Sequence, residues 1–457
     1  MSLKVMGMLI TEFKMTNNYK TSPYRPDIDG LRAIAVLSVV FFHASKNFLR
    51  GGFVGVDIFF VISGYLITRI LINHFYSSNY PLQTIISFYI KRIRRIFPIL
   101  IFVLLFSAFF GCIVLTQNEF KLLGKHIASG AFYISNLVLW SENGYFDTAS
   151  DFKPLLHLWS LAVEEQFYIL WPFLILVFSI YECRLNTSIL IFSVVSFILN
   201  IILIHYYEIG AFYCPITRFW ELSLGGLVAG INIYNKELKN DFISWLGKFL
   251  KKYIFFKNIY NETQIGKNFI SCLGLLLIIY AIVSYRSNLN FPGFWALIPT
   301  FGTCLIILAG NNAFINRNIL SCKLLVFIGI ISYPLYLWHW PLLSFSRIIY
   351  GEIPPRFLRY SIIFCAILLS ILSYKIIETP LRRGGHGICK TFFLLFCMLT
   401  IGILGYKIYC QKLLMLSNQN VVGVIQDLDS NQDVYNKLLN DGKRCKKFFP
   451  KWGDSRV

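Results

Sequence analysis

A series of long apolar runs, separated by short polar loops, extends along most of the 457-residue chain. An apolar helix of about 20 residues is long enough to cross the hydrocarbon core of a bilayer. Only 14% of the residues are charged, whereas soluble domains carry about 25%. The runs predict an all-α polytopic membrane protein with about eleven transmembrane helices. The predicted spans are 31–46, 54–73, 97–115, 155–178, 188–206, 212–232, 268–285, 295–310, 324–349, 358–378 and 392–409.

The apolar run at 127–140 is the one whose crossing decides the topology. If it crossed, the chain would have twelve spans, and the lysine-rich loop 233–267 would face outward. Cytoplasmic loops of membrane proteins collect Lys and Arg. With eleven spans, this loop shares the cytoplasmic side with the basic cluster 91–95 and with the N-terminus. We therefore predict that 127–140 is re-entrant or interfacial, that the N-terminus is cytoplasmic and that the C-terminus is extracytoplasmic.

The chain divides into four predicted parts. Residues 1–30 form a cytoplasmic N-terminal segment, 31–385 the membrane domain, 386–412 an extra transmembrane helix, and 413–457 an extracytoplasmic tail. The net charge of +20 follows from the positively charged cytoplasmic loops, so it does not indicate a nucleic-acid partner. The cysteines are singly spaced in or beside apolar runs, without metal-ligand spacing, and we predict no metal site.

Ionisable side chains within the predicted spans are the strongest pointers to a site, because each costs about 2.5–3.5 kcal/mol at the centre of a bilayer. The candidates are His43, Glu164 and Glu165 for catalysis, and Arg32, Asp57, Arg218 and His339 for substrate binding. Ten residues separate Arg32 from His43, and eleven helical steps are about three turns, so both lie on one face about 16 Å apart. His43 is the most informative candidate, because its span is otherwise apolar from Ala33 to Phe42.

Structural alternatives exist for the other candidates. Asp57 follows Gly-Val and could cap a helix. Arg218 and Glu221 are three residues apart and could pair with each other. His339 lies in an aromatic run and could be a hydrogen-bonded structural residue. The sequence leaves these alternatives open.

The cluster KRIRRIFP at 91–98 precedes the third span and contains Arg92, Arg94 and Arg95. Such a cluster anchors the cytoplasmic end of a span. Its arginines also suit phosphate binding, because a guanidinium binds a phosphate through two hydrogen bonds. The pattern alone does not separate the two roles.

Seven stretches of the chain, taken together and in order, resemble acyltransferase family 3 of membrane proteins, the O-antigen and peptidoglycan acetylase group. The resemblance covers residues 22–385. The stretches are YRPDIDGLRAIAVLSVVFFHA (24–44), GGFVGVDIFFVISGYLIT (51–68), KRIRRIFP (91–98), PLLHLWSLAVEEQFYILWP (154–172), RFWELSLG (218–225), SYPLYLWHWP (332–341) and IETPLRR (377–383).

The resemblance implies a multi-pass enzyme of the bacterial inner membrane. It would transfer an acyl group, usually acetyl, from cytoplasmic acyl-CoA to a hydroxyl of an envelope glycan, such as lipopolysaccharide O-antigen or another surface polysaccharide. The family's Arg-x10-His motif falls on Arg32 and His43, and its Arg-x-Arg motif on Arg92 and Arg94.

A histidine that serves as general base would activate the sugar hydroxyl, which is a poor nucleophile near neutral pH. His43 is the predicted base. A carboxylate on its other ring nitrogen would fix the tautomer, and Glu164 or Glu165 is the candidate for this place. Neighbours on a helix point about 100° apart, so one of the two glutamates is expected to be structural.

A subclass of this family continues, after one extra span, into an extracytoplasmic SGNH-type esterase-like domain. The span 392–409 fits the extra span, and WGDS at 452–455 looks like the first block of an SGNH domain, in which the serine is the nucleophile. The Asp-x-x-His partners are absent, and a serine without its base is not activated. We therefore interpret 413–457 as a truncated SGNH start, with a chance Gly-Asp-Ser tripeptide as the alternative.

Two other functions fit many spans with intramembrane arginines and a histidine. One is an exporter or flippase of an envelope lipid or glycan. The other is an inactive remnant of a larger enzyme. Release of free CoA thiol distinguishes both from an acyltransferase, because only the enzyme cleaves the thioester.

Overall fold

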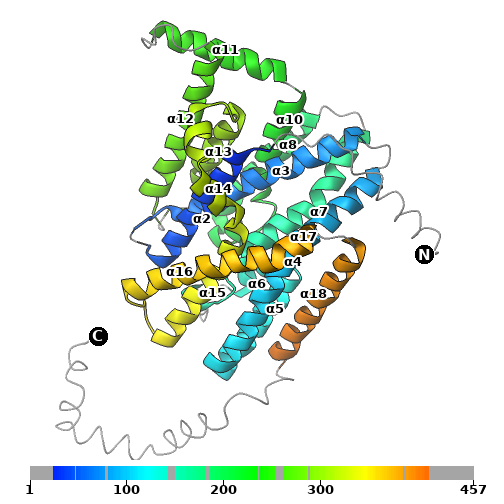
Figure 1. Cartoon of the computed structure of the whole chain (residues 1–457), viewed down its shortest axis with the longest axis vertical. Helices are drawn as coiled ribbons and strands as arrows, with labels where there is room; N and C mark the ends of the chain where they lie inside the picture. Colours follow the sequence, from blue (N-terminus) through cyan, green and yellow to red (C-terminus); the bar gives the residue numbers. More distant parts are fainter. Residues whose placement is uncertain are drawn as a thin grey trace, which may run out of the picture.

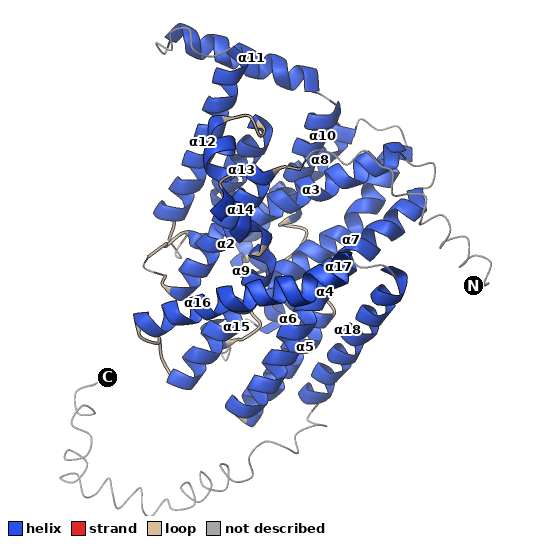
Figure 2. Ribbon diagram, in the orientation of Figure 1, coloured by secondary structure: helices blue, strands red, loops and turns tan. Residues whose placement is uncertain are grey.

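A computed structural model describes residues 24–46, 48–77, 81–142, 150–180, 185–234, 236–253, 262–286, 289–383 and 387–410. Every secondary-structure element in these residues is a helix, as Figure 2 shows. The predicted all-α polytopic fold is therefore confirmed. Most of the predicted N-terminal segment lies outside the described residues, and so does the predicted tail 413–457 with its WGDS sequence.

Seven helical stretches in the described residues are long and apolar enough to cross a bilayer, and a bent helix pair would make an eighth. Each overlaps a predicted span. The seven are α3 (Gly55–Ser77), α4 (Pro81–Val114), α7 (Leu158–Ile180), α8 (Leu185–Tyr206), α12 (Glu262–Ser284), α18 (Gly387–Tyr409) and the continuous stretch of α16 (Arg356–Leu372), η6 (Ser373–Glu378) and α17 (Thr379–Arg383). The bent pair is α14 (Lys323–Ile330) and α15 (Ser332–Tyr350), which meet at 65°.

The other three predicted spans are helical but shorter or more charged. They correspond to α2 (Pro26–Ala44), to α9 (Glu208–Tyr213) with α10 (Phe219–Tyr234), and to η4 (Gly293–Ala296) with α13 (Leu297–Ala309). α10 has 16 residues and α13 has 13, fewer than the about 20 that a helix needs to cross alone. The count of eleven spans and the sides of the two termini stay predictions.

The ambiguous run 127–140 forms part of a helical hairpin made of α5 (Gln117–Ala131) and α6 (Ser135–Glu142). The chain reverses at Tyr133, which has a left-handed φ of 55°. His126 on α5 bonds the carboxylate of Glu142 at the end of α6, with 2.9 Å between Nε2 and Oε2. α6 therefore runs back along α5, and the hairpin agrees with the re-entrant alternative.

The structure corrects the start of the third span. We expected it at residue 97, with the basic cluster in the preceding loop, but α4 begins at Pro81 and includes that cluster. No Gly or Pro interrupts residues 82–97, and the helix also accommodates Pro98. Its 34 residues are about 51 Å long, more than the roughly 30 Å of a bilayer core. The helix is therefore long enough to carry its charged turns beyond the core.

The segment 233–267, which was predicted as a loop, also contains a helix. α11 (Lys236–Tyr253) falls in the loop 233–267 and lies across the ends of α10 and α12, at the top of Figure 1.

α3 is the central helix of the fold. In its apolar window 72% of the residues are buried, compared with 22% for α8, which therefore presents most of its surface to lipid. Glycines bring α3 against α10 backbone to backbone: a Cβ added at Gly64 would lie 1.7 Å from the carbonyl oxygen of Leu222, and one at Gly225 would lie 2.0 Å from that of Val61. Small residues permit this close approach in membrane helices.

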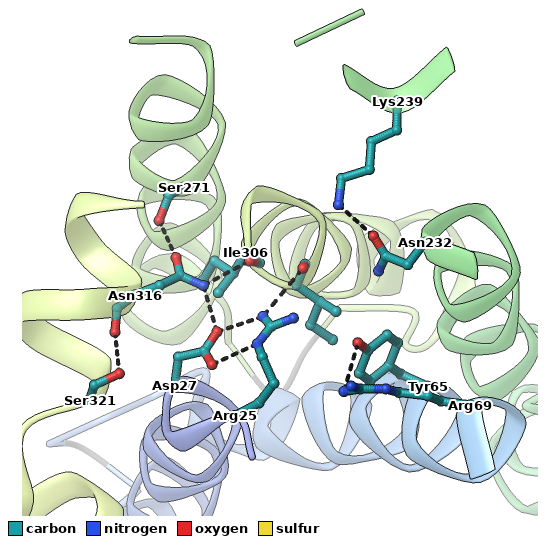
Figure 3. A network of polar contacts seen from close by, with 11 residues as sticks. Arg25, Asp27, Tyr65, Arg69, Asn232, Lys239, Ser271, Ile306, Asn316 and Ser321 are labelled. Atoms are coloured by element: carbon teal, nitrogen blue, oxygen red, sulfur yellow. Dashed lines mark hydrogen bonds and ion pairs between the residues drawn. The ribbon is translucent and has the colours of Figure 1, made fainter. Parts of the chain in front are cut away.

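A buried polar network fixes the first turn of α2 (Figure 3). The guanidinium of Arg25 donates two hydrogen bonds to the carboxylate of Asp27, at 2.8 and 2.6 Å. Asn316 donates to the same carboxylate at 2.8 Å and to the carbonyl of Ile306 at 3.0 Å, and Ser271 donates to Asn316 at 2.6 Å. The network joins α2 to α12, α13 and η5 (Ile315–Leu320).

The far end of α2 is held by two arginines. Arg347 donates to the carbonyl of His43 at 2.5 Å, and Arg359 donates to the carbonyl of Ala44. Cationic donors suit the last carbonyls of a helix, which have no partner within the helix. Because both ends of α2 are fixed, the positions of Arg32 and His43 along it are fixed as well.

Candidate active site

A cavity of about 230 Å³ lies between α2, α3, α4, α7 and α15. Its wall along α3 is mainly apolar, from Val56 to Ile70 with Ser63 as the polar exception, and the other helices contribute most of the polar groups. A second cavity of about 110 Å³ shares Ile67, Ile70, Arg92 and Arg95 with the first, and extends to Lys91 and His74 near the end of α3. The shared lining makes the two cavities parts of one path along α3.

Three arginines make the path cationic: Arg32, Arg92 and Arg95 all line the larger cavity. Arg92 lies over the ring of Tyr168, with its guanidinium carbon 3.7 Å from the ring centre. Its NH2 nitrogen is 3.4 Å from Glu164, so only this arginine of the three has a glutamate of α7 as its ion-pair partner among the described residues. The charge pattern suits an anionic ligand that enters beside Arg95.

Glu164 and Glu165 have different surroundings. Glu164 lines the larger cavity and accepts hydrogen bonds from Ser63, at 2.5 Å, and from the hydroxyl of Tyr168. Glu165 is 8% exposed, lies 3.5 Å from Arg92 and is not part of the lining. Of the two predicted glutamates, the structure therefore places Glu164 in the cavity.

The arginines of the basic cluster also separate. Arg92 and Arg95 are three residues apart and share a helix face, whereas Arg94 points elsewhere. Arg94 is buried and donates from Nε to the carbonyl of Leu381 at 3.0 Å, which ties α4 to α17. The resemblance paired Arg92 with Arg94, but the structure pairs Arg92 with Arg95 at the cavity.

His43 and His339 form a hydrogen-bonded pair. Nδ1 of His43 is 2.9 Å from Nε2 of His339, and the two rings are nearly parallel, at 4°. Nδ1 of His339 is 3.1 Å from the carbonyl of Leu335. A carbonyl only accepts, so Nδ1 of His339 carries the proton and its Nε2 accepts. Nδ1 of His43 must then be the donor, which leaves Nε2 of His43 bare and able to accept a proton.

This pair corrects an expectation from the sequence. A carboxylate from Glu164 or Glu165 was expected at the second nitrogen of His43, but His339 occupies that place. The glutamates instead face Arg92. His339 was predicted to bind substrate, and its contact with Nδ1 makes it the residue that orients His43.

Asp57, Arg218 and Glu221 form a closed ionic triad. Arg218 contacts Asp57 at 2.7 Å and Glu221 at 3.0 Å, and all three side chains are at most 1% exposed. The guanidinium lies beside the rings of Phe60 and Trp159. None of the three residues lines either cavity. Arg218 therefore pairs with Glu221, as the alternative from the sequence allowed, and also with Asp57. The triad joins the first turns of α3 and α10 and lies outside both cavities.

The motifs quoted from the sequence contain a further group of polar residues that was not singled out there. They lie on α7, on the turn just before it and on α15, and are His157, Ser160, Tyr168, Tyr333 and Tyr336. All lie in stretches that carry the family resemblance. His157, Ser160, Glu164 and Tyr168 are spaced by three, four and four residues, which is the period of one helix face. This spacing was the signal that could have found them.

Tyr336 connects the cavity to the histidine pair. It lines the larger cavity, and its hydroxyl lies 2.5 Å from Ser160 Oγ and donates to the carbonyl of His157 at 2.9 Å. Its ring centre is 5.5 Å from that of His339. The path from the arginines therefore ends at Tyr336, and His43 and His339 begin directly behind it. No group of three His, Cys, Asp or Glu residues with metal-binding geometry occurs in the described part of the chain.

The acyltransferase domain family known as Acyl_transf_3 matches residues 25–377. The chain belongs to this family. Members with similar sequences include "O-acetyltransferase OatA" of Staphylococcus aureus (strain NCTC 8325 / PS 47), which is 34% identical over 387 residues, covering 82% of this chain and 60% of the relative. "Putative O-acetyltransferase SAS0844" of S. aureus (strain MSSA476) is 34% identical over 382 residues, covering 80% and 59%.

This acyltransferase 3 family member thus spans about 60% of the length of the curated relatives it matches. No solved structure matches it. The family match covers both ends of the site, from Arg32 and His43 to Tyr336 and His339.

Proposed function

We propose that this chain is an O-acyltransferase that moves an acyl group, acetyl in the first instance, from acyl-CoA to a hydroxyl of an envelope glycan. The observation that carries the proposal is a cationic cavity that ends at Tyr336, next to a histidine pair in which His43 has a bare ring nitrogen. Two relatives named O-acetyltransferases support the type of group transferred.

The donor would bind along α3. CoA carries phosphates at one end and a slender pantetheine arm with the thioester at the other. Lys91 and Arg95 line the smaller cavity and suit the phosphates. The apolar wall of the larger cavity along α3 suits the pantetheine arm. Acyl-CoA is cytoplasmic, so this arrangement requires the end of α3 to face the cytoplasm, as the positively charged loops predict.

The reaction would take place at His43. Its bare Nε2 removes the proton from the acceptor hydroxyl as the oxygen attacks the carbonyl carbon of the thioester. The tetrahedral intermediate then collapses, the carbon–sulfur bond breaks, and the CoA thiolate leaves and takes the proton from His43. His339 holds the His43 ring in the required tautomer throughout.

The proposed acceptor is a class of molecule, the envelope glycans. His43 lies at the opposite end of α2 from Arg32, so an acceptor would approach from the side away from the donor. An envelope glycan meets this requirement, and lipopolysaccharide O-antigen is one such glycan. The inner membrane of a bacterium is the proposed location, because acyl-CoA and nascent envelope glycans are both accessible there.

The test uses the full chain in proteoliposomes with acetyl-CoA and extracted envelope glycan. We expect free CoA thiol to appear only when the glycan is present, together with a mass gain of about 42 Da per acetyl on the glycan. An exporter or flippase would move glycan without releasing thiol, and an inactive remnant would do neither. Absence of acceptor-dependent thiol release from folded protein would refute the proposal.

The sidedness that the proposal needs can be tested separately. In a cysteine-free background, a single cysteine at position 245 lies in α11, and one at position 353 lies in the loop before α16. The eleven-span topology puts the first inside and the second outside. Impermeant thiol reagents applied to intact cells should label only position 353, and equal labelling of both positions would refute the assignment.

A further inference from the structure

His157 is a buried histidine next to the proposed reaction centre that the mechanism above does not use. Its side chain is 2% exposed, and neither ring nitrogen makes a hydrogen bond of good geometry among the described residues, although the backbone of Leu337 lies close enough to interact with the ring. Leaving a buried polar group unpaired costs about 1–3 kcal/mol. An apolar side chain would avoid this cost, so the packing of the fold does not account for a histidine at this position.

The unpaired ring lies where the cavity meets the histidine pair. Its centre is 5.9 Å from that of His339 and 5.5 Å from that of Tyr336. One turn further along α7, Ser160 lines the cavity. His339 is itself bonded to His43. His157 therefore lies at the junction between the space open to a thioester and the base that acts on the acceptor.

We propose that His157 is a further catalytic residue, whose N–H donates a hydrogen bond to the thioester carbonyl oxygen as that oxygen becomes negatively charged. The inference rests on the proposed acyl transfer. A rotation of the Tyr336 side chain, which separates the cavity from His157, would admit the carbonyl.

The chemistry of the site favours a donor over a second base. No carboxylate is among the contacts of His157, and a charged ring in this apolar setting would be costly, so the ring is neutral. A neutral imidazole keeps one N–H. When the hydroxyl oxygen attacks, the carbonyl π electrons move to oxygen, and this N–H stabilises the oxyanion without giving up its proton. A donor that is fixed in advance and makes no well-formed hydrogen bond in the resting enzyme is the arrangement that oxyanion stabilisation requires.

The test compares His157→Leu and His157→Gln with the unchanged protein. Leucine removes an unpaired polar group, so we expect the melting temperature in detergent to be unchanged or higher. Turnover should nevertheless fall about 10²–10³-fold, the usual loss for one oxyanion donor, with little change in the KM for acetyl-CoA. Glutamine keeps an N–H donor and should recover part of the lost turnover.

His126→Leu is a matched control, because His126 is also a buried histidine but is hydrogen-bonded to Glu142 away from the site. It should lower the melting temperature and leave turnover per folded molecule unchanged. Near-normal turnover in His157→Leu, or in a second apolar variant such as His157→Phe, would overturn the inference. So would a glutamine variant no better than leucine, or a loss of stability in both apolar variants. Failure of the unchanged protein to release CoA would instead refute the proposed function.

Discussion

The two ends of the candidate site differ in almost every physical property. The end near Arg92 and Arg95 is hollow and ionised, and its cations line a cavity that continues toward the end of α3. The end near His43 is closely packed: the ring of Trp340 lies 4.4 Å from that of His43, edge to face, and His339 fills its other side. The hollow end has charge and volume, and the packed end has oriented neutral rings.

The difference matches two separate tasks. Binding a phosphorylated donor needs fixed positive charge and room for the ligand. Moving a proton needs a base whose tautomer and orientation are set before the substrate arrives. α2 joins the two, with Arg32 at the cationic cavity and His43 at the histidine pair, about 16 Å apart. If the two ends act separately, substitutions at the packed end should change turnover, and those at the hollow end should change donor affinity.

The largest effect is expected at the packed end, on His43. Replacing His43 by alanine should lower transfer by roughly 10²–10⁴-fold, the contribution of a general base, while the protein still inserts into the membrane. His43→Gln keeps some hydrogen bonding but cannot accept a proton. Near-native CoA release by the glutamine variant, measured per folded molecule, would mean that His43 only packs or orients substrate.

A smaller loss is expected at His339, which orients His43 without touching substrate. The partners that orient metal-bound histidines typically contribute 10–100-fold, and we expect His339→Phe to lower turnover by a similar factor. Because His339 sets the tautomer of His43, the substitution should also shift the pH profile of turnover. The KM for acetyl-CoA should stay constant. An unchanged pH profile would contradict the orienting role.

At the hollow end the effect should fall on donor affinity. Arg95→Gln removes a cation that lines both cavities and should raise the KM for acetyl-CoA about tenfold, which corresponds to about 1.4 kcal/mol, with little change in maximal turnover. Arg94→Gln is the matched control, because Arg94 is two helix positions from Arg92 and bonds Leu381 instead. If both variants change the KM equally, the separation of the two arginines is wrong.

The smallest effect is on stability, at the α5–α6 hairpin. Partial burial alone would raise the pKa of Glu142, but His126, Lys125 and Lys153 around it more than offset this and hold its pKa well below the usual range. Glu142→Gln should therefore lower the free energy of unfolding at pH 7 by about 1–3 kcal/mol.

The pH dependence of this effect follows from the sign of the shift. A lowered pKa in the folded state stabilises the protein above the pKa of an unfolded glutamate, about 4.3, and the stabilisation is lost as the pH falls toward the folded-state pKa. Thermal unfolding in detergent should show a constant difference between Glu142→Gln and the unchanged protein from pH 7 to 5. The difference should narrow below about pH 4, and a difference that grows in acid would contradict the lowered pKa.

The cationic end was easier to predict than the histidine end, for a physical reason. Sidedness of charge and the apolar period are local properties of a sequence, and they predicted that Arg32 and the basic cluster lie on the cytoplasmic side. The structure adds that Arg32, Arg92 and Arg95 line one cavity. Which nitrogen of His43 is bonded, and to what, depends on α15, whose His339 is 296 residues away in the chain. The spacing of apolar residues identifies the apolar face of each helix. It does not identify which other helix packs against that face.

The sequence by itself determined the class of the protein, its apolar helices and the residues that carry its family motifs, because burial of apolar surface in lipid and the expense of intramembrane charge act on each segment separately. The tertiary structure alone decided the partners. It gave His43 a histidine where a carboxylate was expected, separated Glu164 from Glu165 and Arg95 from Arg94, and enclosed Arg218 in an ionic triad. Each of these choices depends on contacts between helices that are distant in the chain, and no local pattern encodes such contacts.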